Sequence, residues 1–246
     1  MSDTYLIYGG TGGIGAATAR LLAKSGHHVH LAARDRPALQ ALADEIGGTF
    51  TAGDLAGEGM ADVAARDAVA AGDGAIKGLV YAIGTINLKP FARLTLADFL
   101  RDFEVNALWA VKTIQSALPY LQKAEGTAGI VLFSTVAVAQ GFASHATIAM
   151  AKGAIEGLTL SLAAELAPKI RVNCIAPSLT RTKLAARLIA SAPVGDAIAA
   201  MHALQRLGTS EDIAPLAALL ASEQGSWITG QIIGVDGGRS SLRSKG

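Results

Sequence analysis

Residues Tyr5 to Ser25 read YLIYGGTGGIGAATARLLAKS, and this stretch decides the predicted fold. A short apolar run ends at Tyr8, a glycine-rich turn follows through Gly15, and small and apolar residues then recur at helical spacing. The pattern predicts a strand, a tight turn and a helix in direct succession. This succession is typical of dinucleotide-binding folds, although glycine runs also occur in ordinary loops.

The predicted turn offers backbone N–H groups at the N-terminus of a helix, where the helix dipole carries a partial positive charge. A pyrophosphate can approach such a turn closely only where no side chain stands in the way, which explains the glycines. We therefore expect a dinucleotide to bind here. The expected contacts come from Gly9, Thr11, Gly13, Ile14 and Gly15, with Thr11 reaching the adenosine ribose or its phosphate.

The composition indicates which partners, disulfides and metal sites can be excluded. The 246 residues carry a net charge of +1 without a basic stripe, so the expected partner is a small-molecule substrate and not nucleic acid. The single cysteine, Cys174, excludes an internal disulfide and stands in an apolar run, which indicates a buried thiol in a reducing compartment. The histidines His27, His28 and His30 lie near one another, but no carboxylate or cysteine stands at ligand spacing, so no metal is expected.

Neither a leader peptide nor a membrane span is expected. The chain does not open on a basic and apolar leader, and we expect a cytoplasmic protein. The segment from Gly126 to Ala151 lacks Lys, Arg, Asp and Glu and is long enough to raise the question of a span. Polar residues such as Gln140 and Ser144 interrupt it, and a buried strand followed by a loop explains it better.

The end of the second predicted strand, Val29 to Ala33, bears on which dinucleotide binds. In dinucleotide folds an acidic side chain near this point holds the ribose 2′-hydroxyl, whereas an arginine accommodates a 2′-phosphate. Here Ala33 takes the place of the acid and Arg34 follows, so we expect NADP rather than NAD. The alternative is that Arg34 only forms a surface ion pair with Asp35.

Strands and helices continue to alternate to the end of the chain. Helices are expected over residues 37–46, 58–70, 96–121, 147–167 and 211–220, and strands over 49–52, 78–82, 130–133, 170–176 and 231–235. The polar and alanine-rich residues 180–205 predict a flexible helical lid, and residues 239–246 are expected to form a partly disordered tail. The alternation predicts an α/β fold: a single doubly wound domain over residues 1–246, with one parallel sheet and helices on both faces.

Ligands of such sheets gather at the carboxyl ends of the strands. Residues with suitable chemistry follow several predicted strand ends, namely Gly9, Arg34, Asp54, Gly84, Thr135 and Pro177. Asp54 can accept a hydrogen bond from an adenine amino group, or else it caps the local turn.

Together these residues resemble the short-chain dehydrogenases/reductases over essentially the whole chain. The matching motifs are Gly9-x3-Gly13-Ile14-Gly15, Asp54-Leu55, Val105-Asn106-Ala107, Lys152, Asn173-Cys174-Ile175-Ala176-Pro177, Thr182, Thr229-Gly230-Gln231 and Asp236-Gly237-Gly238. The resemblance implies a Rossmann-type domain with seven parallel strands, a nicotinamide cofactor and a homotetramer. The cofactor contacts that it implies beyond the glycine turn are Asp54, Leu55, Ala82, Gly84, Lys152, Pro177 and Thr182. NAD remains the alternative to NADP, because the basic residue often found inside the turn of NADP-binding members is Gly12 here.

The family's reaction uses a serine, a tyrosine, a lysine four residues after the tyrosine, and an asparagine that holds a proton-relay water. By this resemblance Thr135 takes the serine's place and Lys152 and Asn106 are kept, but Ile148 stands where the tyrosine is expected. Isoleucine cannot protonate the alkoxide that hydride transfer to a ketone leaves, and losing a general acid typically costs about 10²–10⁴-fold in rate. The replacement donor is expected to be water ordered by Asn106 and Lys152, or His145.

Two functions follow from these residues. The first is an NADP(H)-dependent oxidoreductase for a carbonyl compound or alcohol, with an apolar pocket formed by Ile148, Ile83, Phe142 and the lid. The second is a protein that binds NADP(H) without redox turnover, as a regulator or as a structural partner of an active relative. A third hypothesis is a lyase or isomerase on the same scaffold, but no residue of the sequence supports it.

Overall fold

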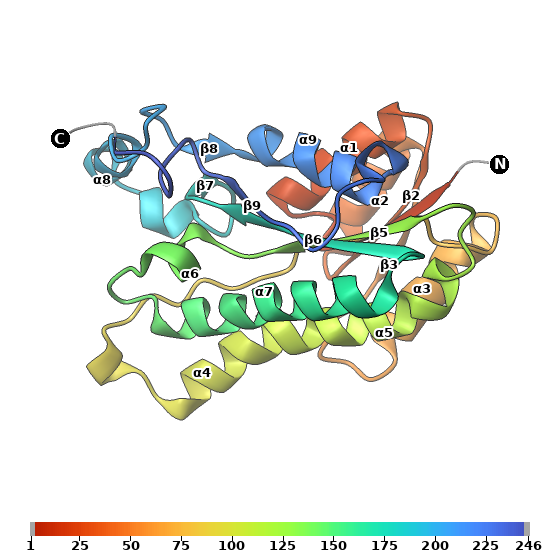
Figure 1. Ribbon diagram of the computed structural model, residues 1–246, viewed down its shortest axis with the longest axis horizontal. Coiled ribbons are helices and arrows are strands. Elements are labelled where there is room, and N and C mark those ends of the chain that lie inside the picture. The colour runs from red at the N-terminus through yellow and green to blue at the C-terminus, as the bar shows by residue number, and fades with distance from the viewer. Residues whose placement is uncertain (1–2, 244–246) are drawn as a thin grey trace.

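The computed structural model describes residues 3–243, so residues 244–246 of the expected tail lie outside it. The centre of the described chain is a sheet of seven parallel strands in the order β3-β2-β1-β4-β5-β6-β9 (Figure 1). The strands are β1 (Thr4–Tyr8), β2 (His28–Ala33), β3 (Thr49–Ala52), β4 (Gly78–Tyr81), β5 (Ala128–Phe133), β6 (Ile170–Pro177) and β9 (Ile232–Val235). The predicted seven-stranded parallel sheet is confirmed.

Helices cover both faces of this sheet, as predicted (Figure 1). One layer consists of α3 (Met60–Ala70), α4 (Leu96–Phe103), α5 (Trp109–Leu121) and α7 (Ala146–Leu166). The other consists of α1 (Gly13–Lys24), α2 (Arg36–Ile46) and α9 (Ser210–Ala221). Because both faces of the central strands are covered, β1, β4 and β5 are buried along their whole length and are almost continuously apolar.

The side chains on the two faces of each central strand pack into two separate hydrophobic cores. On β4, Leu79 packs into the core beneath α3, α5 and α7, and its neighbour Val80 packs into the core beneath α1, α2 and α9. Ile130 and Val131 divide in the same way on β5. Successive side chains of a strand point to opposite faces, so continuous apolar runs are what a doubly covered sheet requires.

The helix expected over residues 96–121 is not uniform. α4 ends at Phe103, a turn of π-helix covers Glu104–Leu108, and α5 continues the rod. The expected long helical element is therefore present over residues 96–121, with a π-helical turn inside it. The π-helical turn carries Asn106, and turns of this kind are frequent at functional sites.

Two further boundaries differ from the expectation. A short helix, α6 (Val136–Gln140), lies in the segment expected to be loop, and Thr135 caps it by accepting a hydrogen bond from Ala137 N at 3.3 Å. The sixth strand, expected over residues 170–176, is one residue longer and ends at Pro177, which pairs with Val235. A proline is tolerated there because it ends the strand.

The expected lid is only partly helical. It begins with β7 (Thr180–Arg181), which pairs with β8 (Gly208–Thr209), and it continues through a 3₁₀ turn (Ala186–Ile189) to α8 (Ala192–Ala199). At the start of the expected tail, Arg239 O accepts a hydrogen bond from Gln140 Nε2 at 2.8 Å, which joins this residue to α6.

Among residues 3–243, none of the helices has the length and apolar character needed to cross a bilayer. The uncharged segment from Gly126 to Ala151 contributes β5, α6 and the start of α7. Its apolar residues Ile130, Val131 and Leu132 are fully buried in the sheet.

Candidate active site

The glycine turn between β1 and α1 is shaped by close packing. Gly9 has φ +78°, and a Cβ built on it would lie 2.8 Å from the backbone carbon of Ala82 on the neighbouring strand segment. A Cβ on Gly15 would collide with the carbonyl oxygen of Gly9. The turn therefore requires glycine at both positions, and it brings the N-terminus of α1, which has no acidic residue in its first turn, to the carboxyl edge of the sheet.

A cavity of about 620 Å³ opens at this same edge. Eight of the residues predicted to bind cofactor or substrate line it: Ile14, Ala82, Gly84, Thr135, His145, Lys152, Pro177 and Thr182. The predicted apolar pocket residues Ile83, Phe142 and Ile148 line it as well. The lid covers it with Leu184, Leu188 and Ile198, so the cavity is predominantly apolar.

The other predicted site residues lie outside this cavity. Gly9, Thr11, Gly13 and Gly15 form the neighbouring turn, and a Cβ on Gly13 would lie 3.0 Å from Thr182 Cγ2. The turn and the start of the lid are thus in contact. Leu55 is buried in the core beneath α3.

Arg34 follows β2 and extends into solvent, with 80% of its side chain exposed. Its guanidinium Nη1 lies 3.8 Å from Asp54 Oδ2, whereas Asp35 caps α2 by accepting a hydrogen bond from Ala38 N at 3.1 Å. The ion pair considered for Arg34 therefore forms with Asp54 and not with Asp35. Asp54 also stabilises its own turn, since its Oδ1 accepts a hydrogen bond from Ala56 N at 3.0 Å.

The histidines near β2 have structural partners on β3. His30 Nδ1 lies 2.8 Å from Thr49 Oγ1, and its Nε2 lies 2.9 Å from Thr51 Oγ1. His28 Nε2 contacts the same Thr49 hydroxyl at 3.0 Å. Burial lowers the pKa of His30 to about 4, so this imidazole is neutral at physiological pH.

Lys152 and Ile148 lie one turn apart on α7 and both face the cavity. Lys152 is only 7% exposed, and burial lowers the pKa of its ammonium to about 8. Among residues 3–243, the hydrogen bonds include none to Lys152 Nζ, although a Cβ on Gly84 would lie 3.6 Å from it. A buried amine therefore faces an apolar cavity without a protein partner.

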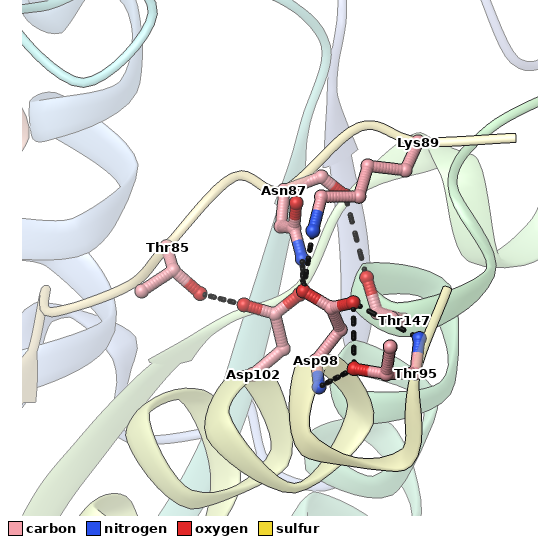
Figure 2. Close-up of polar contacts among 7 residues, drawn as sticks. All are labelled: Thr85, Asn87, Lys89, Thr95, Asp98, Asp102 and Thr147. Carbon is pink, nitrogen blue, oxygen red and sulfur yellow. Dashed lines mark hydrogen bonds and ion pairs between the residues drawn. The ribbon is translucent and has the colours of Figure 1, made fainter. Parts of the chain in front are cut away.

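Asn106, by contrast, has protein partners for both of its amide hydrogens and for one lone pair of its Oδ1. Its Nδ2 donates to Thr85 Oγ1 at 2.7 Å and to Asp102 O at 2.8 Å, and its Oδ1 accepts from Thr85 N at 3.2 Å. Thr85 Oγ1 in turn donates to Asp102 Oδ1 at 2.7 Å (Figure 2). Both amide hydrogens are used, so a relay water can bind this side chain only at Oδ1, which also approaches Gly84.

The loop after β4 is anchored on α4 and α7 (Figure 2). Asp98 accepts hydrogen bonds from Lys89 Nζ at 2.7 Å and from Asn87 Nδ2 at 3.2 Å, and it also closes a capping box with Thr95. These bonds hold the pKa of Asp98 well below its ordinary range. Thr147 adds a bond from α7 by donating to Asn87 O at 3.3 Å. The wall of the cavity formed by this loop is therefore held from two sides.

Thr135 and His145 are two further polar residues that line the cavity. The Thr135 hydroxyl accepts one hydrogen bond from Ala137 N, which leaves its own proton for a substrate oxygen. His145 Nδ1 lies 2.7 Å from Ala143 O, and because a carbonyl only accepts, Nδ1 carries a proton. The imidazole stands edge-on to Phe142, with ring centroids 5.3 Å apart.

Sequence reasoning missed one buried pair at the edge of the cavity. Ser178 Oγ lies 2.8 Å from Nε2 of His202, which is 1% exposed, and His202 Nδ1 lies 2.9 Å from Ile198 O. The pair joins the end of β6 to the segment that follows α8. No spacing signal could have found it, because 24 residues separate the partners.

Comparisons with known proteins agree with this arrangement. A family model described as enoyl-(acyl carrier protein) reductase matches residues 9–240. A tropinone reductase homolog from Arabidopsis thaliana is 33% identical over 241 residues, covering 96% of this chain and 91% of that protein. A structure described as a short-chain dehydrogenase/reductase, glucose/ribitol dehydrogenase, from Brucella melitensis superposes with a TM-score of 0.90 at 31% identity, covering 98% and 97% of the two chains. The structure of ElxO with NADP bound superposes with a TM-score of 0.89 at 28% identity, covering 98% and 100%.

Proposed function

The chain belongs to the short-chain dehydrogenase/reductase family, and we propose that it is an NADP(H)-dependent oxidoreductase acting on an apolar carbonyl compound or alcohol. The observation that carries the proposal is the meeting of three features at one edge of the sheet: the glycine turn, the unpartnered Lys152 amine and the 620 Å³ apolar cavity. A nicotinamide dinucleotide needs an anion site, a donor for ribose hydroxyls and room beside them for a substrate.

The residues present fit such a cofactor. The N-terminus of α1 suits the pyrophosphate, with Gly9, Thr11, Gly13, Ile14 and Gly15 around it. Lys152 Nζ has no competing partner in the described chain and would donate to the nicotinamide ribose. The further contacts that we propose along the edge are Asp54, Leu55, Ala82, Gly84, Pro177 and Thr182.

Arg34 supports NADP over NAD. Its guanidinium is exposed, and its ion pair within residues 3–243 is the 3.8 Å contact to Asp54. Exposed pairs of this kind contribute little, so the arginine can turn to a 2′-phosphate at small cost. The solved relative ElxO has NADP bound. NAD remains the alternative cofactor.

In the proposed reaction a bound cofactor would supply or accept the hydride, and the chain would supply orientation and the proton. Thr135 donates a hydrogen bond to the carbonyl oxygen, and the Lys152 ammonium stabilises the negative charge that develops there. Ile148 supplies no proton. We propose that the proton comes from water held near Lys152 and Asn106 Oδ1, or from His145, which lines the same cavity.

The test is steady oxidation of NADPH with a panel of apolar ketones and aldehydes. The proposal predicts turnover with at least one of them and its loss in Lys152→Met. A His145→Ala variant separates the two proton routes, since unchanged turnover rules out the imidazole.

The second candidate is a protein that binds NADP(H) without redox turnover, as a regulator or a structural partner. Ile148 favours it, because this residue is 5% exposed and fills the position from which a proton donor would act. Tight NADPH binding together with no oxidation across the panel supports this candidate and excludes the first.

We further propose a cytoplasmic homotetramer. Apolar side chains are exposed on two regions, one on α4 with Leu96 at 81% and Leu100 at 70%, and one at Trp227, which is 99% exposed. Two separate apolar regions suit an assembly with two kinds of interface. Sedimentation analysis at micromolar concentration tests the assembly, and a monomer would contradict it.

A further inference from the structure

The Lys152 amine is chemically unlike the other buried lysine of the described chain. Lys77 is 5% exposed, but its ammonium contacts Glu125 O and lies 2.5 Å from Glu223 Oε1. Lys152 is 7% exposed, and within residues 3–243 no carboxylate or carbonyl oxygen bonds to its ammonium. A desolvated amine without a partner favours its neutral form, and the neutral form is the nucleophile.

We propose that Lys152 is itself a nucleophile, which captures apolar aldehydes and ketones in the cavity as imines. This activity goes beyond the proposed hydride transfer, since it uses the amine to form a bond to carbon and not to hold a cofactor. It needs no cofactor, so it can be tested independently of the proposed function.

Two residues leave the amine open to a carbonyl compound. Gly84 has no side chain, and a Cβ there would lie 3.6 Å from Lys152 Nζ, so larger residues would cover the amine. Ile148, one turn earlier on α7, presents methyl groups where a phenol would bond to the amine. The 620 Å³ cavity is large enough for an aromatic aldehyde beside both residues.

The reaction balances within this site. The Nζ lone pair adds to the carbonyl carbon, and one proton moves from the nitrogen to the oxygen to give a carbinolamine. The C–O bond then breaks as the C=N bond forms, and the oxygen leaves as water with the second proton that the nitrogen gives up. Thr135 and His145 line the same cavity and provide a hydroxyl and an imidazole for these proton transfers. No oxidant or reductant is consumed.

The neutral fraction of each lysine determines how selectively an aldehyde should react with Lys152. Burial lowers the pKa of Lys152 from its ordinary 10.5 to about 8, so about a tenth of the amine is neutral at pH 7. A lysine with the ordinary pKa has a neutral fraction about 300-fold smaller at pH 7. Lys152 should therefore react well ahead of exposed lysines despite its restricted access.

Benzaldehyde with sodium cyanoborohydride at pH 7 tests the proposal, because the reductant adds hydride to the imine and fixes it as a benzylamine. Peptide mass mapping of the wild-type protein should find Lys152 modified at least tenfold faster than the buried Lys77 and the exposed Lys183. Lys152→Arg keeps the positive charge and should lose this fast reaction while the surface lysines react as before. Modification of Lys152 no faster than that of Lys183 would overturn the proposal.

A parallel reaction with saturating NADPH keeps this result distinct from the proposed function. Protection of Lys152 by NADPH supports both, because cofactor and aldehyde then compete for one amine. Fast modification that NADPH does not prevent supports the imine and counts against Lys152 as a cofactor contact. NADPH binding without any fast modification overturns the imine alone.

Discussion

Replacing Ile148 by tyrosine should raise carbonyl reduction. The side chain is 5% exposed and lines the cavity one turn before Lys152, so a phenol placed there would face both the ammonium and a substrate oxygen. The nearby positive charge favours the ionised form and so lowers the pKa of the phenol, which suits it to give up a proton. A positioned general acid contributes about 10²–10⁴-fold in rate, or about 3–5 kcal/mol of activation free energy.

The assay is steady-state oxidation of NADPH with the best substrate found for the wild-type protein. Ile148→Phe is the matched control, because it adds the aromatic ring without the hydroxyl. Thermal unfolding of both variants measures overpacking, which typically costs about 1–3 kcal/mol. If Ile148→Tyr reduces the substrate no faster than Ile148→Phe, the absent proton donor is not what limits this site, and the reasoning about Ile148 is refuted.

Three further perturbations test separate parts of the structure. Arg34→Ala should weaken NADPH binding about tenfold and leave NADH binding unchanged, as measured by titration calorimetry, because a charge-assisted phosphate contact is lost. Gly9→Ala should lower stability by about 3 kcal/mol or more, because its Cβ would strike the Ala82 backbone. Gly26→Ala, at φ +85° with nothing within 4 Å of its Cβ, is the control and should cost only about 1 kcal/mol. Urea unfolding of both glycine variants measures the two costs. Burial lowers the pKa of His30 from its ordinary 6.5 to about 4, so between these pH values the unfolded chain binds a proton that the folded chain does not. The free energy of unfolding should therefore fall by up to about 3 kcal/mol as the pH is lowered from 6.5 to 4. His30→Asn should reduce this pH dependence.

The sheet was predictable because its signals are local. Runs such as Tyr5 to Tyr8 and Ile130 to Phe133 are apolar on both faces, and only a doubly covered parallel sheet uses such runs throughout. The glycine turn was predictable for the same reason. Glycine is required at Gly9 and Gly15 by contacts with residues close in sequence or on one neighbouring strand.

The remaining features depend on contacts between distant segments. β7 and β8 are two residues long, so no periodicity marks them, and they exist because Thr180 and Gly208 are brought side by side. The π-helical turn at Asn106 coincides with bonds to Thr85 that a helical pattern does not encode. Arg34 pairs with Asp54 across β2 and β3, although the adjacent Asp35 is nearer in sequence.

The candidate site residues differ in the same way in how far the sequence predicts them. Spacing along α7 relates Lys152 to Ile148, and both line the cavity as expected. The sequence pattern carried no signal that the Asn106 amide would be fully used by Thr85 and Asp102, or that Lys152 would lack a partner, because both properties arise from tertiary packing.

The most direct test of the central claim is an equilibrium titration of the purified protein with NADPH and, separately, with NADH. The glycine turn, Arg34 and Lys152 predict that NADPH binds, and that it binds about tenfold more tightly than NADH. Binding of neither nucleotide, or binding of NADH as tight as that of NADPH, would contradict it.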